Sequence, residues 1–265
     1  MIDLRHQRQM ILPQVGEEGQ RRLRGAAVLL VGLGGLGSPA ALYLAAAGVG
    51  RIGLMDDQRV DESNLQRQVL YESRDLGRLK AEAAADRIRR HDASLRVDVI
   101  GEAFTSTNAA NYMPAYDLTV DGTDAFETKF LLNDAAIILR RPLVHGAVLQ
   151  WAGQALTVLP SGPCLRCLFR DPPDPGSVPT CEEAGILGAT VGVIGSVQAE
   201  EVLKLILGTG QVLSGRIHQH DGLTGETRIV AFPKDPDCPV CSGDPQIRDL
   251  SAYHVQVSPR GHVLV

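Results

Sequence analysis

A glycine-rich stretch near the N-terminus has the residue types of a phosphate-binding loop. The run VLLVGLGGLGSPA, residues 28–40, places Gly32, Gly34 and Gly37 in the spacing G-x-G-x-x-G directly after an apolar segment. Such glycines allow a tight turn, close approach of the backbone to phosphate and close helix–strand packing. Asp56 follows at about the 20-residue distance of a carboxylate that binds ribose hydroxyls. A nucleotide site is therefore predicted, the alternative being a tight turn without ligand, and the loop alone does not distinguish NAD from ATP.

The residues after Asp56 favour a triphosphate. The segment DESNLQRQVLYESRDLGRLKAEAA supplies Asn64, Arg67 and Lys80. A dehydrogenase cofactor carries one pyrophosphate and needs little extra cationic charge, whereas Arg and Lys suit a triphosphate whose leaving pyrophosphate must be neutralised. Taken singly, Arg67 and Lys80 are better explained as a solvated surface. Their combination with the glycine loop favours ATP.

Two carboxylates follow a later apolar run. The segment VDGTDAFETKFLLND places Asp121 and Asp124 at the carboxyl end of a predicted strand, the edge where open parallel sheets bind ligands. A carboxylate beside phosphates is a natural Mg²⁺ ligand, and we assign this role to Asp124. The alternative for Asp124 is the N-cap of the helix that follows.

Four of the five cysteines form two C-x-x-C pairs, and Cys181 is left over. Paired C-x-x-C motifs in a protein of the cytoplasm indicate a metal rather than disulfides. Four thiolates leave no coordination position open, so they predict a structural zinc site that ties the C-terminal part of the chain to the strand region. The alternative is four unrelated core thiols. The predicted ligands are Cys164, Cys167, Cys238 and Cys241.

Alternating strands and helices must position these residues. The patterns predict strands at 26–31, 51–56, 95–100, 117–121 and 142–148, with helices at 38–47, 79–90 and 127–139. This alternation implies a parallel sheet with right-handed crossovers. The predicted fold is therefore α/β, a Rossmann-like, mostly parallel sheet with helices on both faces, followed by an antiparallel, zinc-binding C-terminal portion.

The pattern changes after the fifth predicted strand. Residues 153–160 can pair antiparallel with the strand before them, and the proline-rich run RDPPDPGSVPT cannot hold regular structure, which predicts an exposed, mobile loop. A helix at 191–207, strands near 216–220 and 227–232, and a hairpin in the tail with its turn at SPRG complete the predicted elements.

Composition limits the class of protein. The chain has 265 residues, of which 44% are hydrophobic and 22% charged, as is usual for a globular protein. No stretch reaches the roughly 18 uninterrupted apolar residues of a membrane span, and the polar start MIDLRHQRQM is not a signal peptide. A net charge of −5 gives no global attraction to nucleic acid. We expect a cytoplasmic protein with neither membrane nor nucleic acid as a direct partner.

Together these motifs resemble the prokaryotic E1-like adenylating enzymes, the family of MoeB, ThiF and HesA. The matching runs are RQ at Arg8–Gln9, VGLGGLG, SNLQRQ, GRLKAEAA, DGTD, GPCLRC, CEEAG and DCPVC, over about residues 5–241. The chain departs from several relatives by lacking a proline soon after Glu-Ala-Gly, and from some by lacking a C-terminal rhodanese domain. The resemblance implies an N-terminal arm at 1–25, an E1-like adenylation domain at 26–241 with a proline-rich mobile loop at 170–189, and a C-terminal extension at 242–265.

The resemblance also implies a reaction. The C-terminal Gly-Gly carboxylate of a ubiquitin-like sulfur carrier, similar to MoaD or ThiS, attacks the α-phosphate of ATP, giving the carrier acyl-adenylate and pyrophosphate. Such activation serves molybdopterin, thiamine or thiolated-tRNA synthesis. A carboxylate is ionised at pH 7 and needs no general base, so the enzyme orients in-line attack and stabilises charge. An external sulfur donor, a cysteine desulfurase or a rhodanese, is then required.

Residue roles follow from the same resemblance. Arg8 matches an arm arginine that reaches into the partner subunit's site, which implies a homodimer; the alternative is an exposed charge. Cys181 matches a cysteine that in some relatives attacks the acyl-adenylate or forms an acyl-disulfide; the alternative is a loop thiol without a role. The nucleotide-binding set comprises Gly34 and Gly35 at the phosphates, Asp56 at the ribose, Asn64, Arg67 and Lys80 at the phosphates, and Asp124 at Mg²⁺.

Three alternatives stay open at this point. An ATP-dependent tRNA-modifying dehydratase has the same fold, although phosphate backbones need clustered Lys and Arg and the chain is acidic. A nicotinamide oxidoreductase would use the same glycine loop. An inactive subunit that holds ATP without turnover is disfavoured by the intact Arg67, Lys80 and Asp124.

Overall fold

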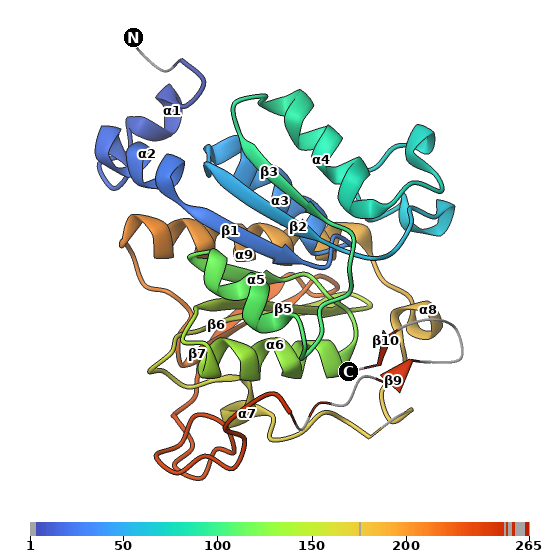
Figure 1. Cartoon of the computed structure of the whole chain (residues 1–265), viewed down its shortest axis with the longest axis vertical. Coiled ribbons are helices and arrows are strands. Elements are labelled where there is room, and N and C mark those ends of the chain that lie inside the picture. The colour runs from blue at the N-terminus through green and yellow to red at the C-terminus, as the bar shows by residue number, and fades with distance from the viewer. Residues whose placement is uncertain (1–3, 175, 252, 254–255, 258–262, 265) are drawn as a thin grey trace.

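The chain folds around an eight-stranded sheet (Figure 1). The computed structural model describes residues 4–174, 176–251, 253, 256–257 and 263–264. The strand order is β3-β2-β1-β4-β5-β6-β7-β8; β1 to β5 are parallel to one another, and the pairs β5–β6, β6–β7 and β7–β8 are antiparallel. The strands are β1 Ala27–Val31, β2 Arg51–Met55, β3 Arg96–Ile100, β4 Leu118–Asp121, β5 Leu143–Leu149, β6 Ala152–Val158, β7 Arg216–Asp221 and β8 Glu226–Ala231.

Helices cover both faces of the sheet. One face packs against α3 (Gly37–Ala47), α4 (Lys80–His91) and α9 (Gly188–Leu207), and the other against α5 (Ala109–Tyr112), α6 (Phe126–Ile138) and α7 (Leu165–Leu168). At the amino end of β1, α1 (Gln7–Met10) and α2 (Gly16–Gly25) form the N-terminal part, and α2 contacts α9 (Figure 1). Short 3₁₀ helices are η1 Glu62–Asn64, η2 Ser73–Asp75 and η3 Met113–Ala115.

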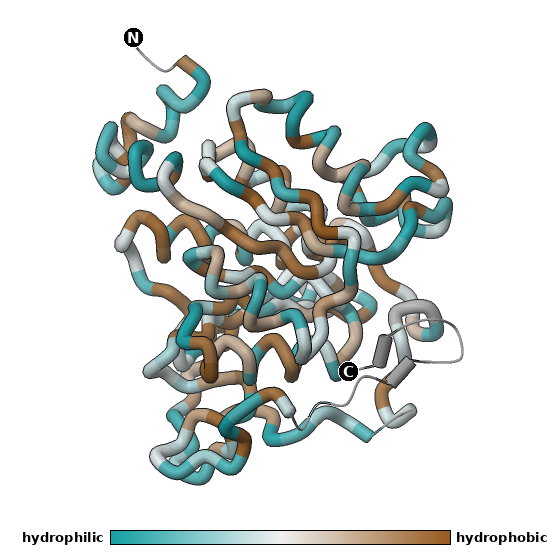
Figure 2. The backbone as a smooth tube through the Cα atoms, in the orientation of Figure 1, coloured by the Kyte–Doolittle hydropathy of each residue, from teal (hydrophilic) through white to brown (hydrophobic). Residues whose placement is uncertain are grey.

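Local sequence explains these elements. The central strands of the sheet, such as β1 with the sequence AVLLV, are runs of apolar residues, which Figure 2 shows in brown against the hydrophilic outer loops. In α4 the buried residues Ala81, Ala84, Ala85 and Ile88 recur at i, i+3, i+4 and i+7, so one stripe faces the sheet, while Glu82, Arg89 and Arg90 are exposed. None of the helices in the described part of the chain is long and apolar enough to cross a membrane.

The predicted α/β fold is confirmed. The predicted strands and longer helices differ from the observed ones mainly at their ends, whereas the short helices α5 and α7 were not predicted. The loop predicted over 170–189 contains α8 (Cys181–Ala184) and the start of α9. Helix α8 begins because Thr180 and Glu183 form a capping box, with Thr180 N–H donating to Glu183 Oε2 at 2.8 Å and Glu183 N–H to Thr180 Oγ1 at 3.3 Å. Within 170–180, the described residues form neither helix nor strand.

The tail contains the predicted antiparallel pair, β9 (Gln256–Val257) with β10 (Val263–Leu264). Its predicted turn, SPRG at 258–261, lies outside the described residues. The division into an arm at 1–25, an adenylation domain at 26–241 and an extension at 242–265 stays a prediction.

Three glycines meet where the strand order reverses between β1 and β4. Gly32 has a φ of 83°, and a Cβ added there would lie 2.7 Å from the carbonyl carbon of Gly122. A Cβ on Gly37 would lie 2.1 Å from the Gly32 oxygen, and one on Gly122 would lie 2.3 Å from the same atom. Only glycine fits at these positions, so the loops after β1 and β4 pack directly against each other.

Two glycine-to-alanine variants test this contact. We expect Gly37→Ala to lower the free energy of unfolding by about 1–3 kcal/mol, because the added methyl overlaps backbone that cannot rotate away. The control is Gly192→Ala within α9, where an added Cβ meets nothing within 4 Å. This control should raise stability by about 0.5–1 kcal/mol through helix propensity. Denaturant unfolding measures both, and equal behaviour of the two variants would contradict the packing argument.

Candidate functional site

The glycine loop between β1 and α3 is held in shape by side chains from neighbouring segments. Asp56, directly after β2, accepts the Leu33 N–H at 2.8 Å through one oxygen and the Gln58 N–H at 2.8 Å through the other. The Tyr71 hydroxyl donates to the Leu33 carbonyl at 2.8 Å. Burial raises the pKa of Asp56, while Lys80 and the two N–H donors oppose this. The carboxylate predicted for ribose therefore also fixes the loop, which sequence reasoning did not anticipate.

Lys80 and Arg67 both lie beside this loop. Lys80, the first residue of α4, is only 4% exposed, and its Nζ donates to Gln58 Oε1 at 2.7 Å. The alternative of a solvated surface lysine is therefore wrong. Arg67 donates to the Ser63 carbonyl at 2.9 Å, and its aliphatic carbons lie 3.7 Å from the position of a Cβ on Gly35. The aliphatic part of Arg67 thus packs beside the glycine loop, with its guanidinium in the adjoining Ser63 segment.

Asn64 and Gln68 flank Arg67 in the same segment. Asn64 closes η1, its Oδ1 accepting the Asp61 N–H at 3.4 Å. Gln68 is buried next to the loop, with its Nε2 at 3.5 Å from the position of a Cβ on Gly34, and its Oε1 has no hydrogen-bond partner among the described residues. A buried oxygen without a partner beside a phosphate-type loop suits a site that takes a ligand. Sequence reasoning assigned Gln68 no role, although it ends the SNLQRQ motif.

Asp121 and Asp124 differ in their surroundings. Asp121 is fully buried, 3.1 Å from Lys129 Nζ and 2.7 Å from His145 Nδ1, so its charge is already compensated. Asp124 is exposed, and its carboxylate makes no hydrogen bond or ion pair within the described chain. The N-cap of α6 is Ala125, without a side-chain cap, so the alternative role for Asp124 is not observed. Asp124 therefore presents a free carboxylate at the edge that carries the glycine loop.

Arg8 does not reach this edge within its own chain. It is exposed on α1 and has no bonding partner in the part of the chain described. Its neighbour Gln9 donates to Ala47 O at 2.8 Å, at the C-terminal end of α3, whereas the glycine loop precedes the N-terminal end of that helix. The length of α3 therefore separates Arg8 from the glycine loop of its own chain.

Cys181 begins α8, and the chain after it is anchored near the loop. Gln150 N–H donates to Gly185 O at 3.1 Å, and Leu187 N–H donates to Gln150 O at 3.0 Å. Gly188 then packs against the Arg67 backbone, because a Cβ there would lie 3.3 Å from Arg67 Cα. The segment that carries Cys181 thus leads directly into the candidate nucleotide site.

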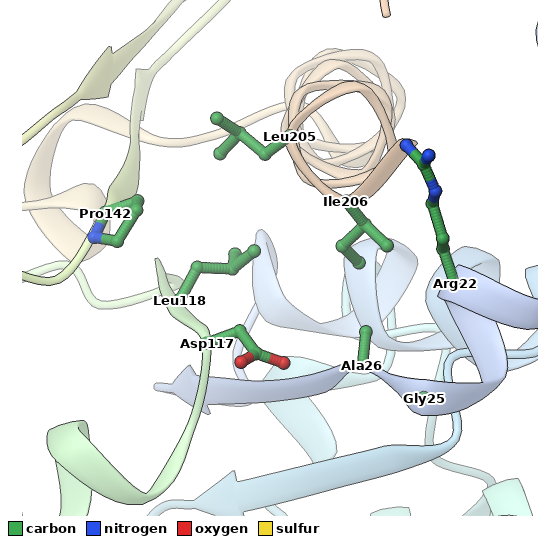
Figure 3. A pocket seen from close by; sticks show the side chains of 8 residues that line it. All are labelled: Arg22, Gly25, Ala26, Asp117, Leu118, Pro142, Leu205 and Ile206. Atoms are coloured by element: carbon green, nitrogen blue, oxygen red, sulfur yellow. The ribbon is translucent and has the colours of Figure 1, made fainter. Parts of the chain in front are cut away.

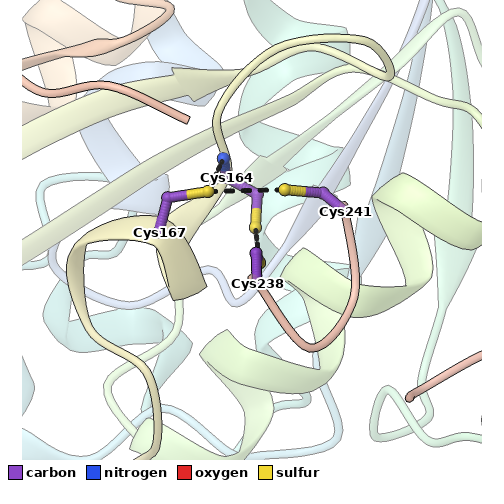
Figure 4. A group of neighbouring side chains, drawn as sticks. All are labelled: Cys164, Cys167, Cys238 and Cys241. Carbon is purple, nitrogen blue, oxygen red and sulfur yellow. Dashed lines mark hydrogen bonds between the residues drawn. The ribbon is translucent and has the colours of Figure 1, made fainter. Parts of the chain in front are cut away.

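The four paired cysteines converge, as predicted (Figure 4). Their sulfur atoms all lie within 4.8 Å of one another, with Cys164 3.6 Å from Cys238 and Cys167 3.4 Å from Cys241. A tetrahedral zinc site with Zn–S bonds of about 2.3 Å requires sulfur separations of about 3.8 Å. Contacts with the other thiols lower the pKa of Cys164 to about 6, while burial raises the pKa of Cys238 to about 11. The donor set and spacing fit a four-thiolate metal centre.

A different hollow, of about 330 Å³, lies at the amino edge of the sheet (Figure 3). The charged side chains of Arg22 and Asp117, which line it, are hydrogen-bonded to backbone groups of the protein. Arg22 donates to the Leu207 carbonyl at 3.1 Å, and Asp117 accepts the Ala27 N–H at 2.8 Å. This hollow therefore offers little to a nucleotide, and the carboxyl edge remains the candidate site.

The glycine loop at the reversal of strand order, the cations beside it and the four-thiol cluster occur together in a mixed α/β fold of the predicted kind. The model of the ThiF family matches residues 6–240. The chain therefore belongs to the ThiF family, as its motifs indicated.

Several curated proteins are similar along most of this chain. The sulfur carrier protein adenylyltransferase of Thermus thermophilus is 48% identical over 255 residues, covering 94% of each chain. The SAMP-activating enzyme E1 of Haloferax volcanii is 43% identical, covering 93% of this chain and 92% of that protein. The adenylyltransferase and sulfurtransferase MOCS3 of Drosophila willistoni is 46% identical, covering 95% of this chain and 56% of that protein.

Solved structures share the fold. The crystal structure of E. coli MccB with MccA-N7isoASN superimposes with a TM-score of 0.80 at 20% identity, covering 92% of this chain and 75% of that one. At this identity the likeness concerns the arrangement of strands and helices alone.

Proposed function

We propose that this protein is an ATP-dependent adenylyltransferase that activates the C-terminal carboxylate of a small ubiquitin-like sulfur carrier ending in Gly-Gly. The products are the carrier acyl-adenylate and pyrophosphate. One observation carries the proposal: a glycine loop, the buried Lys80, Arg67 and the free Asp124 carboxylate share one edge of the sheet. The names of two relatives that match nearly end to end, a sulfur carrier protein adenylyltransferase and a SAMP-activating enzyme E1, support the choice of substrate.

The site would act by orientation and charge. The carrier carboxylate is ionised at neutral pH and attacks the α-phosphate without a general base. Arg67 and Lys80 stabilise the charge that develops on the phosphates, and Lys80 does so strongly because it is buried.

The remaining groups hold the nucleotide in place. Asp56 binds the ribose, and Asn64 binds the phosphates together with the backbone of Gly34 and Gly35. Asp124 would hold Mg²⁺, which supplies charge neutralisation at the phosphates.

The four cysteines are proposed to hold a structural zinc ion. The cluster joins α7 to the segment after β8, and α7 is itself fixed to α6, where Leu165 N–H donates to Asn133 Oδ1 at 2.8 Å. Closed four-thiolate coordination has no position for substrate, so the ion would stabilise the fold. Cysteines that form no disulfide bonds fit a reducing compartment, and we place the reaction in the cytoplasm.

Partner contributions complete the proposal. Arg8 is proposed to enter the site of a second copy of this chain, which its separation from its own glycine loop supports. Cys181 is proposed to attack the carrier acyl-adenylate, because its segment leads to Arg67. Its thiolate would form a thioester and release AMP. If the external donor has first transferred a sulfane sulfur to Cys181, the outer persulfide sulfur would instead form an acyl disulfide, again with release of AMP. The sulfur itself would come from an external donor, a cysteine desulfurase or a rhodanese.

Pyrophosphate–ATP exchange tests the reaction. Exchange should require both Mg²⁺ and a Gly-Gly carrier, and Asp124→Ala should reduce it to background, while Lys80→Met should slow it by about 10²–10³-fold. Asp124→Ala should keep the thermal midpoint of the parent protein, because the side chain is exposed and unbonded. Tight binding of NAD combined with no binding of ATP would refute the proposal.

Metal analysis tests the zinc site. The purified protein should contain about one zinc per chain, and Cys238→Ser should lose both the metal and several kcal/mol of stability. Cys181→Ser serves as the matched control, since it changes the one cysteine that belongs to neither C-x-x-C pair. A metal-free protein with unaltered stability would contradict the assignment.

Mixing two inactive variants tests the shared site. An Arg8→Ala chain combined with an Asp124→Ala chain forms mixed dimers in which one of the two sites is whole. About a quarter of the parent activity should return at equal mixing, since half of the dimers are then mixed. No recovery, after subunit exchange has been verified with labelled chains, would argue against a contribution from Arg8 across the interface.

A further inference from the structure

A cluster of buried charged and polar side chains lies directly behind the turn that carries Asp124. It consists of Asp121 at the end of β4, Lys129 in α6 and His145 in β5, whose side chains are 0%, 5% and 2% exposed. One Asp121 oxygen lies 3.1 Å from Lys129 Nζ and 2.7 Å from His145 Nδ1. Lys129 also donates to the carbonyl of Gly146 at 2.7 Å. None of these three side chains has a part in the proposed chemistry.

Within this cluster Asp121 is the anion and Lys129 the cation. Burial alone would raise the pKa of Asp121, but Lys129 and the hydrogen bond from His145 outweigh it, so this pKa lies below its usual value. Burial lowers the pKa of His145, which leaves the ring neutral with its Nδ1–H donating to the carboxylate. The cluster is therefore a compensated ion pair whose carboxylate is held from two elements besides its own strand.

The same carboxylate fixes the turn. Its second oxygen accepts the Thr123 N–H at 3.0 Å and the Thr123 hydroxyl at 2.7 Å. The backbone carbonyl of Asp121 accepts a hydrogen bond from Gln198 of α9 at 2.8 Å. Asp124 is the next residue and has no bond of its own in the described chain, so its direction depends on how Thr123 is held.

We propose that Asp121, Lys129 and His145 form a positioning cluster that acts through Thr123 to aim the Asp124 carboxylate at the metal ion of the bound nucleotide. This rests on the proposed adenylation function. A fixed carboxylate loses less conformational freedom on binding the ion than one on a loose turn, so the cluster should set how much Mg²⁺ the enzyme needs. The residues are positioning residues, because none of them touches the nucleotide in this scheme.

Thr123 allows a test that leaves the buried ions in place. It is only partly buried, so Thr123→Val removes the hydroxyl donor at nearly constant volume, and Thr123→Ser restores it. Thr227→Val on the exposed β8 is the matched control, because it removes a hydroxyl that contacts His220 Nδ1 at 3.1 Å far along the sheet. Far-UV spectra establish that each variant is folded.

Two readouts separate positioning from a structural role. The first is hydrogen–deuterium exchange of the 121–126 amides in the ligand-free protein, which needs no catalysis. The second is the Mg²⁺ concentration at half-maximal pyrophosphate exchange, with ATP and carrier saturating. Thr123→Val should raise the exchange rate of these amides and the half-maximal Mg²⁺ concentration by about tenfold each, the size expected for one lost hydrogen bond to a charged group. The KM for the carrier should stay constant. Thr123→Ser should return both toward the parent values.

The outcomes are distinguishable. An active parent protein in which Thr123→Val behaves like Thr227→Val in both readouts would overturn the positioning role alone. A lower thermal midpoint without a change in the Mg²⁺ requirement would do the same, since that is the signature of a structural role. A parent protein without carrier-dependent exchange would refute the adenylation function, and the aim of Asp124 with it.

Discussion

The direct backbone contact between the loops after β1 and β4 is the constraint on which the rest of the site depends. β1 and β4 pair in parallel, so their loops leave the same edge of the sheet side by side. Gly32, Gly37 and Gly122 pack so closely that a single added carbon at any of them would overlap backbone atoms. Sterics thus make the glycine loop and the Asp124 turn one rigid unit, and the groups proposed to bind the nucleotide are arranged around it.

Burial of charge at this edge is possible because each buried group has a partner. Asp56 accepts two backbone N–H groups, Lys80 donates to Gln58, and Asp121 pairs with Lys129 and His145. An isolated buried ion costs several kcal/mol, so these hydrogen-bond and ion-pair partners offset the cost of burying the groups. The same low-dielectric setting strengthens the attraction between Lys80 and a phosphate.

Helix α9 connects the parallel and antiparallel parts of the sheet. Its first residue, Gly188, packs on the Arg67 segment, and Gln198 in its middle bonds to Asp121 and Val144. Its last residue, Leu207, accepts a bond from Arg22 in α2. On the opposite face the cysteine cluster joins α7 to the segment after β8, so both faces link segments distant in the chain. This explains how a site at the parallel edge is supported by residues from the antiparallel half.

The sequence by itself determined the strands, the longer helices and the motifs. The order of strands and helices follows from periodicity, because apolar alternation and spacing act within a few residues of one another. The glycine loop and the two C-x-x-C pairs could be predicted for the same reason, since their chemistry lies in adjacent residues. The Thr180–Glu183 capping box was also local, and it was missed because prolines dominate the preceding segment.

Tertiary structure decided the surroundings of each charged side chain. Lys80 is buried with Gln58 as its hydrogen-bond partner, and Asp121 differs from Asp124 because β5 and α6 bring His145 and Lys129 to it alone. Those partners are separated in sequence by up to 24 residues, and nothing in a local pattern specifies which of two nearby carboxylates they meet. Burial and pairing of charge depend on packing between segments, and packing is set only when the whole sheet and its helices have assembled.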